Sequence, residues 1–258
     1  MCLIALAWQV AADYPLTLIG NRDEFHQRPA RPAQPWQEEG MPGLLAGKDL
    51  EAGGTWLGIT RDGRFAALTN IRTPGAMRGP LSRGKLVLDY LATDSTPEDY
   101  LTPLSTQAGD YAGFNLLVGD RNSLWYLNSL EGKPRPLPPG VYGLSNAELD
   151  SDWPKLTKLR EQLAAQPLAP AEQLLALLHD DHIYADALLP KTGVNPDLER
   201  MLSAAFIRGN QDYGTRASSL LRLHANNDVE LVEQRFGPLG EAEGESRWRL
   251  AAAISAPA

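Results

Sequence analysis

The alternation of hydrophobic and polar positions is clearest at the start of the chain. In residues 2–10 both alternating sets of side chains are largely apolar, which favours a strand buried on both faces. A turn is predicted at residues 11–15, and the apolar residues 16–20 then form the returning strand of a hairpin. This strand is followed directly by a polar run, Asn21, Arg22, Asp23 and Glu24. The hairpin is therefore expected to carry the polar run back toward Cys2.

Strand-like runs recur along the rest of the chain. Arg61-Asp62-Gly63 separates two such runs and is typical of a tight hairpin turn. Residues 25–47 are rich in proline, arginine and glutamine without a clear period, so we expect a long loop that lies over a sheet. The predicted strands after this loop are residues 53–60, 64–70, 114–119, 124–127, 141–145, 215–223, 229–236 and 246–252.

Helical spacing and helix-start residues predict helices between these strands. Ser82 is the expected N-cap of the first helix, and Thr96 caps the second, with proline at its first position and acidic residues in its first turn. The predicted helices cover residues 83–92, a segment that starts at residue 97, a segment that starts at residue 154 with leucines at helical spacing, and residues 171–178 and 198–206.

Antiparallel hairpins dominate this order of elements, and a regular alternation of strand, helix and strand is not visible. We therefore predict an α+β fold with mainly antiparallel sheets whose outer faces are covered by helices. No internal repeat or break in composition marks a boundary, so residues 1–258 are predicted to form a single domain. Residues 253–258 are expected to be frayed.

Composition narrows the functional classes. The net charge is −8 and basic residues are scattered, which argues against a nucleic-acid partner or a polybasic membrane patch. A single cysteine cannot form an internal disulfide, and no apolar run approaches the ~18 residues that cross a membrane. The apolar start lacks the features of a signal peptide. We therefore expect a cytoplasmic protein, without stable membrane insertion, that acts on a small molecule; the sequence does not indicate its oligomeric state.

Cys2 is the first candidate for chemistry because of its position. Removal of Met1 before this small residue would leave a thiol and a free α-amine on the same residue. The α-amine, with a pKa of roughly 7.7–8 in model peptides, can act as the general base for the thiol. The alternative is that Cys2 is simply a small buried hydrophobic residue. The histidines stand in no recognisable motif and are assigned to surface or structural roles: His26, His179, His182 and His224.

Polar residues at the ends of predicted strands are candidates to assist the thiol. Asp23 can accept a hydrogen bond from the α-amine, and Arg22 can lower the pKa of the thiol. Asn70 and Asn146 each end a strand and can stabilise an oxyanion, although asparagine is also common at strand ends.

A further set of residues is predicted to bind substrate: Asn21, Glu24, Arg72 and Arg216. Arg216 begins an apolar strand, from which it can reach an anionic group. The Gly-Gly-Thr turn at residues 53–55 can form a small anion nest. For Arg216 and for this turn, a structural role is the alternative.

Several short motifs carry a family resemblance, and they extend from residue 2 to about residue 219. In chain order they are Met1-Cys2, Asn21-Arg22-Asp23-Glu24, Gly53-Gly54-Thr55-Trp56-Leu57-Gly58, Thr69-Asn70, Gly143-Leu144-Ser145-Asn146 with Asp150, Trp153-Pro154-Lys155, and Tyr213-Gly214-Thr215-Arg216. In number and order, these motifs resemble the NRDE family, which is the family of Transport and Golgi organisation protein 2.

A more distant resemblance is to the N-terminal-nucleophile (Ntn) hydrolases of the penicillin acylase and bile-salt hydrolase type. This resemblance implies a four-layer αββα sandwich and a processed N-terminal cysteine. It also implies that Asn146 and Asn70 match the asparagines around the oxyanion and that Arg216 matches a late active-site arginine. The order of the polar run at residues 21–24 departs from the hydrolase pattern, which leaves the roles of its arginine and its two acids open.

Two functions from different classes follow. The first is a cysteine Ntn amidohydrolase that attacks the C–N bond of an amide, or a thioester. Its predicted catalytic residues are Cys2, Arg22, Asp23, Asn70 and Asn146. The second, implied by the family resemblance, is a non-catalytic protein that carries haem, an acyl-CoA or another lipid in the same cleft. No metal or cofactor is expected to be required, and haem would be a non-covalent ligand because the sequence has no Cys-x-x-Cys-His motif. A pure scaffold is a third alternative, which leaves the polar cluster unexplained.

Overall fold

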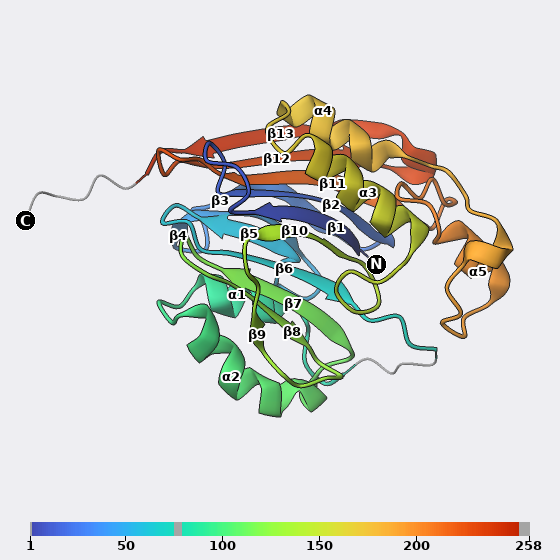
Figure 1. Cartoon of the computed structure of the whole chain (residues 1–258), viewed down its shortest axis with the longest axis horizontal. Helices are drawn as coiled ribbons and strands as arrows, with labels where there is room; N and C mark the ends of the chain where they lie inside the picture. The colour runs from blue at the N-terminus through green and yellow to red at the C-terminus, as the bar shows by residue number, and fades with distance from the viewer. Residues whose placement is uncertain (1, 75–78, 253–258) are drawn as a thin grey trace, which may run out of the picture.

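Two antiparallel β-sheets pack face to face in this protein (Figure 1). The computed structural model describes residues 2–74 and 79–252, so Met1 and residues 253–258, for which processing and fraying are predicted, lie outside the described residues. The first sheet has the strand order β10 (Gly140–Leu144), β1 (Cys2–Trp8), β2 (Leu16–Phe25), β11 (Tyr213–Leu223), β12 (Val229–Phe236) and β13 (Ala242–Leu250). The second has the order β3 (Ala30–Trp36), β4 (Met41–Asp49), β5 (Leu57–Thr60), β6 (Phe65–Asn70), β7 (Phe114–Gly119), β8 (Leu124–Asn128) and β9 (Arg135–Pro136).

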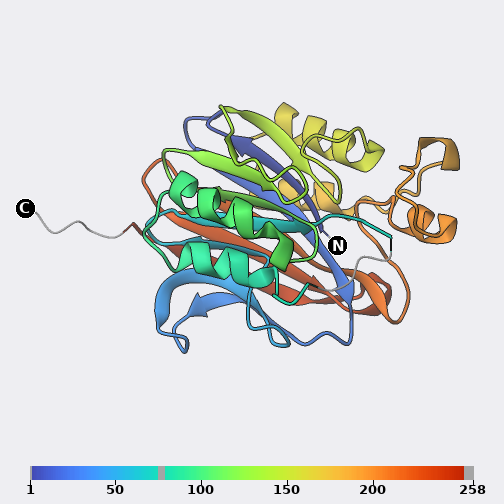
Figure 2. The same ribbon diagram turned by 90° about the horizontal axis from the view of Figure 1, so that it is seen from below.

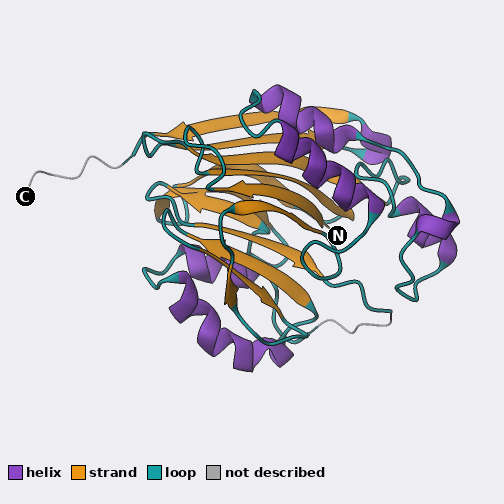
Figure 3. Ribbon diagram, viewed as in Figure 1, coloured by secondary structure: helices purple, strands orange, loops and turns teal. Residues whose placement is uncertain are grey.

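Helices lie on the outer faces of both sheets (Figure 3). The helices are α1 (Gly84–Leu91), α2 (Pro97–Gln107), α3 (Pro154–Ala165), α4 (Ala171–Ala176) and α5 (Pro196–Met201), with short 3-10 turns at Ala108–Asp110, Leu177–His179, Asp186–Leu188 and Pro238–Gly240. α3 and α4 cover the first sheet, and α1 and α2 lie across the second, as the view from below shows (Figure 2). The order of layers confirms the predicted α+β fold and its four-layer αββα sandwich. None of the helices in the described ranges is long and apolar enough to cross a bilayer.

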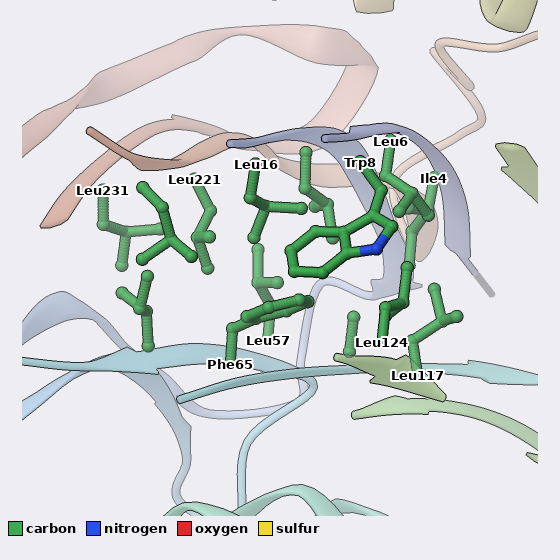
Figure 4. Packing of buried hydrophobic residues seen from close by; sticks show 14 of the residues in the cluster. Ile4, Leu6, Trp8, Leu16, Leu57, Phe65, Leu117, Leu124, Leu221 and Leu231 are labelled. Carbon is green, nitrogen blue, oxygen red and sulfur yellow. The ribbon is translucent and has the colours of Figure 1, made fainter. Parts of the chain in front are cut away.

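The main hydrophobic core lies between the two sheets (Figure 4). Trp8 of β1 and Phe65 of β6 meet there with ring centroids 5.9 Å apart. Along β1, Ile4 and Leu6 point into this core, whereas Ala5 and its neighbours of the other alternating set face α3. Both faces of β1 are buried, as its apolar pattern predicts, because the strand lies between a sheet and a helix layer.

Residues 25–47 form the edge strands β3 and β4 rather than a loop, so that prediction was wrong. Pro32 and Pro35 lie in β3, at the edge of the second sheet, where a missing backbone N–H costs no ladder hydrogen bond. The register between β3 and β4 shifts twice, which is typical of bulges. These shifts remove the regular two-residue period that would have identified the strands.

Helix starts were predicted with mixed success. Thr96 caps α2 as expected, and its hydroxyl accepts the backbone N–H of Asp99 at 3.1 Å. Ser82 does not cap α1 through its side chain; its backbone carbonyl instead accepts the N–H of Lys85 in a tight turn. This turn packs against Gly54, where a Cβ atom would come within 2.4 Å of Gly84. The tertiary contact therefore sets the helix start.

The predicted helix over residues 198–206 is displaced toward the N-terminus. α5 begins after Asn195, whose side-chain oxygen accepts the N–H of Asp197, and it ends at Met201. Beyond that point the carbonyl groups of Leu202 and Ala204 are bound by a side chain from α3. The segment therefore continues as a buried, irregular stretch instead of a helix.

Candidate active site

The first strand of the chain opens onto a cleft of about 840 Å³. The cleft is lined by residues of both sheets, of the segment before α1 and of α5. Cys2 is one of the lining residues and is only 7% exposed. In the β1–β2 hairpin, Cys2 lies directly opposite Arg22, so the predicted hairpin does bring the polar run to the cysteine.

The polar run continues into a chain of charges along the cleft. Arg22 Nη2 lies 3.6 Å from Glu24 Oε2, and the same oxygen lies 3.9 Å from Arg28 Nε. Arg28 is held in turn by Asp49, with Nη2 and Oδ2 2.7 Å apart. Arg22 and Glu24 both line the cleft, as the predicted roles of these residues require.

Asp23 lies at the same end of β2 and is 1% exposed. Its Oδ1 accepts a hydrogen bond from the Thr215 hydroxyl at 2.7 Å, and that hydroxyl accepts the backbone N–H of Ile207 at 2.8 Å. Burial raises the pKa of the Asp23 carboxyl, while the charge of Lys155 and the Thr215 hydrogen bond oppose that rise. The carboxyl is therefore a buried acceptor fixed beside the start of β1.

Burial also has the largest effect on the pKa of the Cys2 thiol. It raises the pKa of the thiol to about 11; the nearby charges of Asp23 and Glu24 add to the rise, and Arg22 opposes it. A thiol with this pKa is almost entirely protonated at neutral pH. A nucleophilic Cys2 therefore needs a group that accepts its proton during attack.

The ends of β6 and β10 meet next to Cys2. Asn70 lines the cleft, and its backbone carbonyl accepts the side-chain N–H of Asn146 at 2.8 Å. Asn146 is 2% exposed and is not among the lining residues, and its own carbonyl accepts the backbone N–H of Arg72 at 2.7 Å. Ser145 donates to the carbonyl of Cys2 at 3.4 Å. Of the two predicted oxyanion residues, Asn70 lines the cleft, whereas Asn146 lies outside the lining and binds the backbone of Asn70.

Asn21 differs from the sequence expectation that it binds substrate. Its side chain is fully buried on the helix-covered side of β2 and donates to the carbonyls of Leu178 and Ala205, at 2.9 and 2.8 Å. The Ser218 hydroxyl donates to its side-chain oxygen at 2.6 Å. Because side chains alternate along a strand, Asn21 and Arg22 point to opposite faces, and only Arg22 reaches the cleft.

Arg72 also lies away from the cleft lining. Its guanidinium is 2.5 Å from Glu199 of α5 and stacks over the Trp153 ring, 4.7 Å from the ring centre. The Thr192 hydroxyl donates to the same carboxylate. Both charged side chains of the pair are nearly inaccessible, at 3% and 7% exposure, so Arg72 anchors α5 beside the cleft instead of lining it.

Arg216 lines the cleft as predicted and owes its direction to an irregularity in β11. The register between β11 and β2 shifts around this residue, which is a bulge that can re-aim a side chain. Its Nη1 donates to the carbonyls of Arg28 and Phe25, at 2.7 and 3.3 Å. In the part of the chain that the structure describes, no carboxylate forms an ion pair with Arg216, so its charge remains available to an anionic ligand.

The sequence did not indicate several other members of the site. Tyr213 lines the cleft, and burial holds the pKa of its phenol well above the usual value. Lys155 is buried, and its Nζ donates to the carbonyl of Leu202, a lining residue, at 2.7 Å. An apolar wall is formed by Leu81, Leu198 and Met201. The motifs that contain Tyr213 and Lys155 were a usable signal, whereas the apolar wall comes from segments without any motif.

The cleft has few groups that bind metals. None of the four histidines, all of them described, is a lining residue. Within the described ranges, no three histidine, cysteine or acidic side chains are grouped as they would be around a metal ion. The lining residues that can ligate haem iron are Cys2, Tyr213 and Met201.

Comparison with known proteins places these features in a family. Residues 1–238 match the family model described as Transport and Golgi organisation 2. The Transport and Golgi organization protein 2 homolog of Bos taurus is 37% identical over 243 residues, covering 86% of each chain. The homolog of Homo sapiens is 35% identical over 240 residues, with the same coverage. These matches confirm the family resemblance in the sequence motifs.

Solved structures are similar at much lower identity. A mutant of the conjugated bile acid hydrolase from Clostridium perfringens is 10% identical, with a TM-score of 0.44 over 99% of both chains. The Caenorhabditis elegans ortholog of N-acylethanolamine-hydrolyzing acid amidase is 9% identical, with a TM-score of 0.38 over 69% of this chain and 85% of that one.

Proposed function

We propose that this chain, which belongs to the Transport and Golgi organisation 2 family, uses Cys2 as an N-terminal nucleophile to hydrolyse an amide or a thioester. One observation carries the proposal: the only cysteine of the chain, at position 2, opens into the cleft opposite Arg22 and beside the buried Asp23. A buried structural cysteine would not require this polar setting. The proposed compartment is the cytoplasm.

The α-amine of Cys2 is the proposed general base, after removal of Met1. The thiol needs a base because burial raises its pKa to about 11, and no histidine lines the cleft within the described ranges. An α-amine has an ordinary pKa close to neutrality, roughly 7.7–8, and stands on the same residue as the thiol. Asp23, whose Oδ1 accepts a hydrogen bond from Thr215, is the proposed partner of the protonated amine.

The reaction then proceeds in two halves. The amine takes the thiol proton as sulfur attacks the carbonyl carbon, and a C–S bond forms while the carbonyl oxygen becomes an oxyanion. The ammonium returns this proton to the leaving nitrogen, the C–N bond breaks, and a thioester of Cys2 remains. Water then attacks the thioester with the amine as base, the C–S bond breaks, and the sulfur regains its proton as the carboxylic acid leaves.

Asn70 is the proposed oxyanion donor, since Asn70 is a lining residue of the cleft. Asn146 supports it, because its amide holds the Asn70 backbone at 2.8 Å. Arg22 is the nearest cation across the hairpin and can add to the stabilisation of negative charge.

The cleft walls indicate a substrate with two different ends. Leu81 and Leu198 are partly exposed at the apolar wall, at 45% and 36%, and suit an acyl chain. Arg216 lies on a different wall, on β11, with no carboxylate partner among the residues described, and suits an anionic leaving group. The volume of about 840 Å³ is in the range of pockets for drug-sized ligands, roughly 300–1,000 Å³.

Binding without turnover is the second candidate, favoured by the high pKa of the Cys2 thiol. Haem fits this cleft poorly, because burial keeps two of its three available iron ligands, Cys2 and Tyr213, protonated. An acyl-CoA or another lipid with an anionic head group matches the apolar wall and Arg216 better. The carrier version is therefore proposed for that class of ligand.

The test combines mass spectrometry with turnover. Intact mass shows whether Met1 is removed, and hydrolysis is measured on a panel of N-acyl amides and acyl-CoA thioesters for the wild type, Cys2→Ala and Cys2→Ser. We expect the processed wild type to release product and Cys2→Ala to bind the same compounds without releasing any. Equal turnover by Cys2→Ala, or by a form that retains Met1, would refute the proposal. Titrations with haem and with acyl-CoA that give binding but no product would establish the carrier function instead.

A further inference from the structure

A buried carboxyl on β12 lines the cleft and has no part in the proposed mechanism. Glu233 is 6% exposed, and its side chain reaches toward the second sheet. Its Oε1 accepts the backbone N–H of Ala33 on β3 at 2.8 Å. Ala33 lies where the register between β3 and β4 shifts, so the N–H that Glu233 binds is not part of the regular ladder. One oxygen of the carboxyl therefore links the two sheets.

The second oxygen of this carboxyl, Oε2, is accessible from the cleft. Within residues 2–74 and 79–252 it has no hydrogen-bond partner, and it is not among the polar atoms that the packing encloses. Gly47, another lining residue, leaves it open, because a Cβ atom at this position would lie only 3.4 Å from Oε2. A ligand in the cleft can therefore reach a buried acceptor at Glu233.

Two arginines lie near Glu233, but neither forms an ion pair with it in the part of the chain that the structure describes. Arg235 is two residues further along β12, on the same face of the strand. Its Nη1 donates to the Ser246 hydroxyl at 2.7 Å instead. Burial raises the pKa of the Glu233 carboxyl, whereas the charges of Arg235 and Arg22 lower it. These positive charges disfavour an ammonium group beside Oε2, so a neutral donor is the better match.

Glu233 lies across the first sheet from Cys2. The registers of β1, β2, β11 and β12 place Arg235 level with Cys2, and Glu233 two residues nearer the core. Neighbouring strands lie about 4.8 Å apart and rise about 3.4 Å per residue, so the backbones of Cys2 and Glu233 are about 16 Å apart. Arg216, the proposed site for an anionic leaving group, lies on β11 between them. A leaving group that extends past Arg216 therefore comes to Glu233.

We infer that Glu233 is a specificity-determining residue for the leaving group: its Oε2 accepts a hydrogen bond from a neutral O–H or N–H group of a long, extended ligand. The substrate class is an amide or thioester whose leaving group carries such a donor roughly 16 Å from the reacting carbonyl. The inference rests on the proposed function, because reaction at Cys2 divides the ligand into an acyl part and a leaving group. The alternative is a structural role, in which the carboxyl only holds Ala33 in place.

The substitution Glu233→Gln separates these two roles. Glutamine has the same shape and keeps an oxygen that accepts the N–H of Ala33, so the link between the sheets is retained. The atom in the place of Oε2 becomes an NH₂ group, which donates a hydrogen bond and does not accept one. Glu230→Gln is a matched control on the same strand, since Glu230 pairs with His224 at 3.1 Å and does not line the cleft.

Binding is measured by calorimetry in the Cys2→Ala form, so that affinity is read without turnover. The probes are N-hexanoyl ω-aminoalkanols of increasing chain length and their O-methyl ethers, which keep the terminal oxygen as an acceptor but lose the donor. At the chain length that spans the cleft, we expect the alcohol to bind about ten-fold more tightly than its ether, as is typical of a hydrogen bond to a charged acceptor. This preference should disappear in Glu233→Gln and persist in Glu230→Gln.

A purely structural carboxyl would give a different result. The preference for the alcohol would then be the same with Glu233→Gln as without it, or absent at every chain length, and either outcome would overturn the inference, as would a failure of every alcohol to bind. If Glu233→Gln does not fold, Gly47→Ala takes its place: the added methyl group would contact Oε2 and should reduce the preference. Failure of the proposed function is distinguishable, because a Cys2 that hydrolyses nothing leaves the preference for the alcohol intact.

Discussion

Breaking the buried ion pair between Arg72 and Glu199 should destabilise the protein strongly. The two side chains are 3% and 7% exposed, and their charged atoms are 2.5 Å apart. Replacing one partner leaves the other charge buried without compensation, which typically costs 3–5 kcal/mol. We therefore expect a loss of about 4 kcal/mol for Glu199→Gln, and a similar loss for Arg72→Met, which also removes the stacking on Trp153.

This loss of unfolding free energy can be converted to a decrease in melting temperature. An unfolding entropy of about 2.1 cal/mol/K per residue gives about 0.5 kcal/mol/K for 258 residues, so 3–5 kcal/mol corresponds to a Tm lower by about 6–9 °C. The double variant Arg72→Met with Glu199→Leu should recover part of the loss, because no unpaired charge is left in the interior.

The assay is thermal unfolding followed by circular dichroism, with denaturant unfolding as a second measure of free energy. Arg200 supplies the control within the same helix: it pairs with Asp186 at 2.6 Å, and both side chains are well exposed, at 43% and 64%. Arg200→Ala should change Tm far less than the buried variants, since solvent screens an exposed pair. Equal effects at Arg200 and Glu199 would refute the view that burial makes the Arg72 pair important.

Three other outcomes test the site. Asn21→Ala should lower the free energy of unfolding by about 2–4 kcal/mol, because it leaves two buried carbonyls unpaired. The ligand affinity of the folded protein should stay unchanged. Weaker binding in a calorimetric titration would show instead that Asn21 contributes to the substrate site. Arg216→Met should weaken binding of anionic ligands roughly ten-fold at low salt, with partial recovery in Arg216→Lys. An unchanged Kd would show that Arg216 does not bind the anionic group. The pKa of Lys155 is about 8 in the folded protein against an ordinary value of 10.5, so the folded state binds fewer protons between these pH values. The free energy of unfolding should therefore rise with pH across that window, by up to about 3 kcal/mol, in denaturant titrations of the wild type but not of Lys155→Met; parallel profiles for the two proteins would contradict the burial of this charge.

Local patterns were sufficient to place most strands and several helices. The two runs of the first hairpin, the Asp-Gly turn before β6 and the leucines of α3 all carry a period or a turn residue that acts over a few positions. The edge strands β3 and β4 escaped prediction because bulges and prolines interrupt their period. The end of α5 escaped it because a lysine from another helix binds the carbonyl groups beyond that helix.

The site, too, was predicted in part from local patterns and set in part by tertiary contacts. The hairpin made it predictable that Cys2 and the polar run would meet, because seven residue pairs of an antiparallel register, Cys2 with Arg22 through Trp8 with Leu16, follow from one turn. Which face each polar residue would occupy was not settled by that register alone. Asn21 and Arg22 are neighbours, yet one is bound inside the helix layer and the other lines the cleft.

The sequence by itself determined the position of the nucleophile candidate, its hairpin partner and the antiparallel α+β architecture, since these depend on alternation and turns between neighbouring residues. Only the tertiary structure decided that Lys155 binds backbone carbonyls beyond α5, that Glu199 anchors α5 to Arg72 and that Arg216 is turned into the cleft by a bulge. Each of these pairs or placements joins segments far apart in the chain. Burial sets the strength of such charge interactions, and burial is a property of the packed molecule that no local pattern of residues contains.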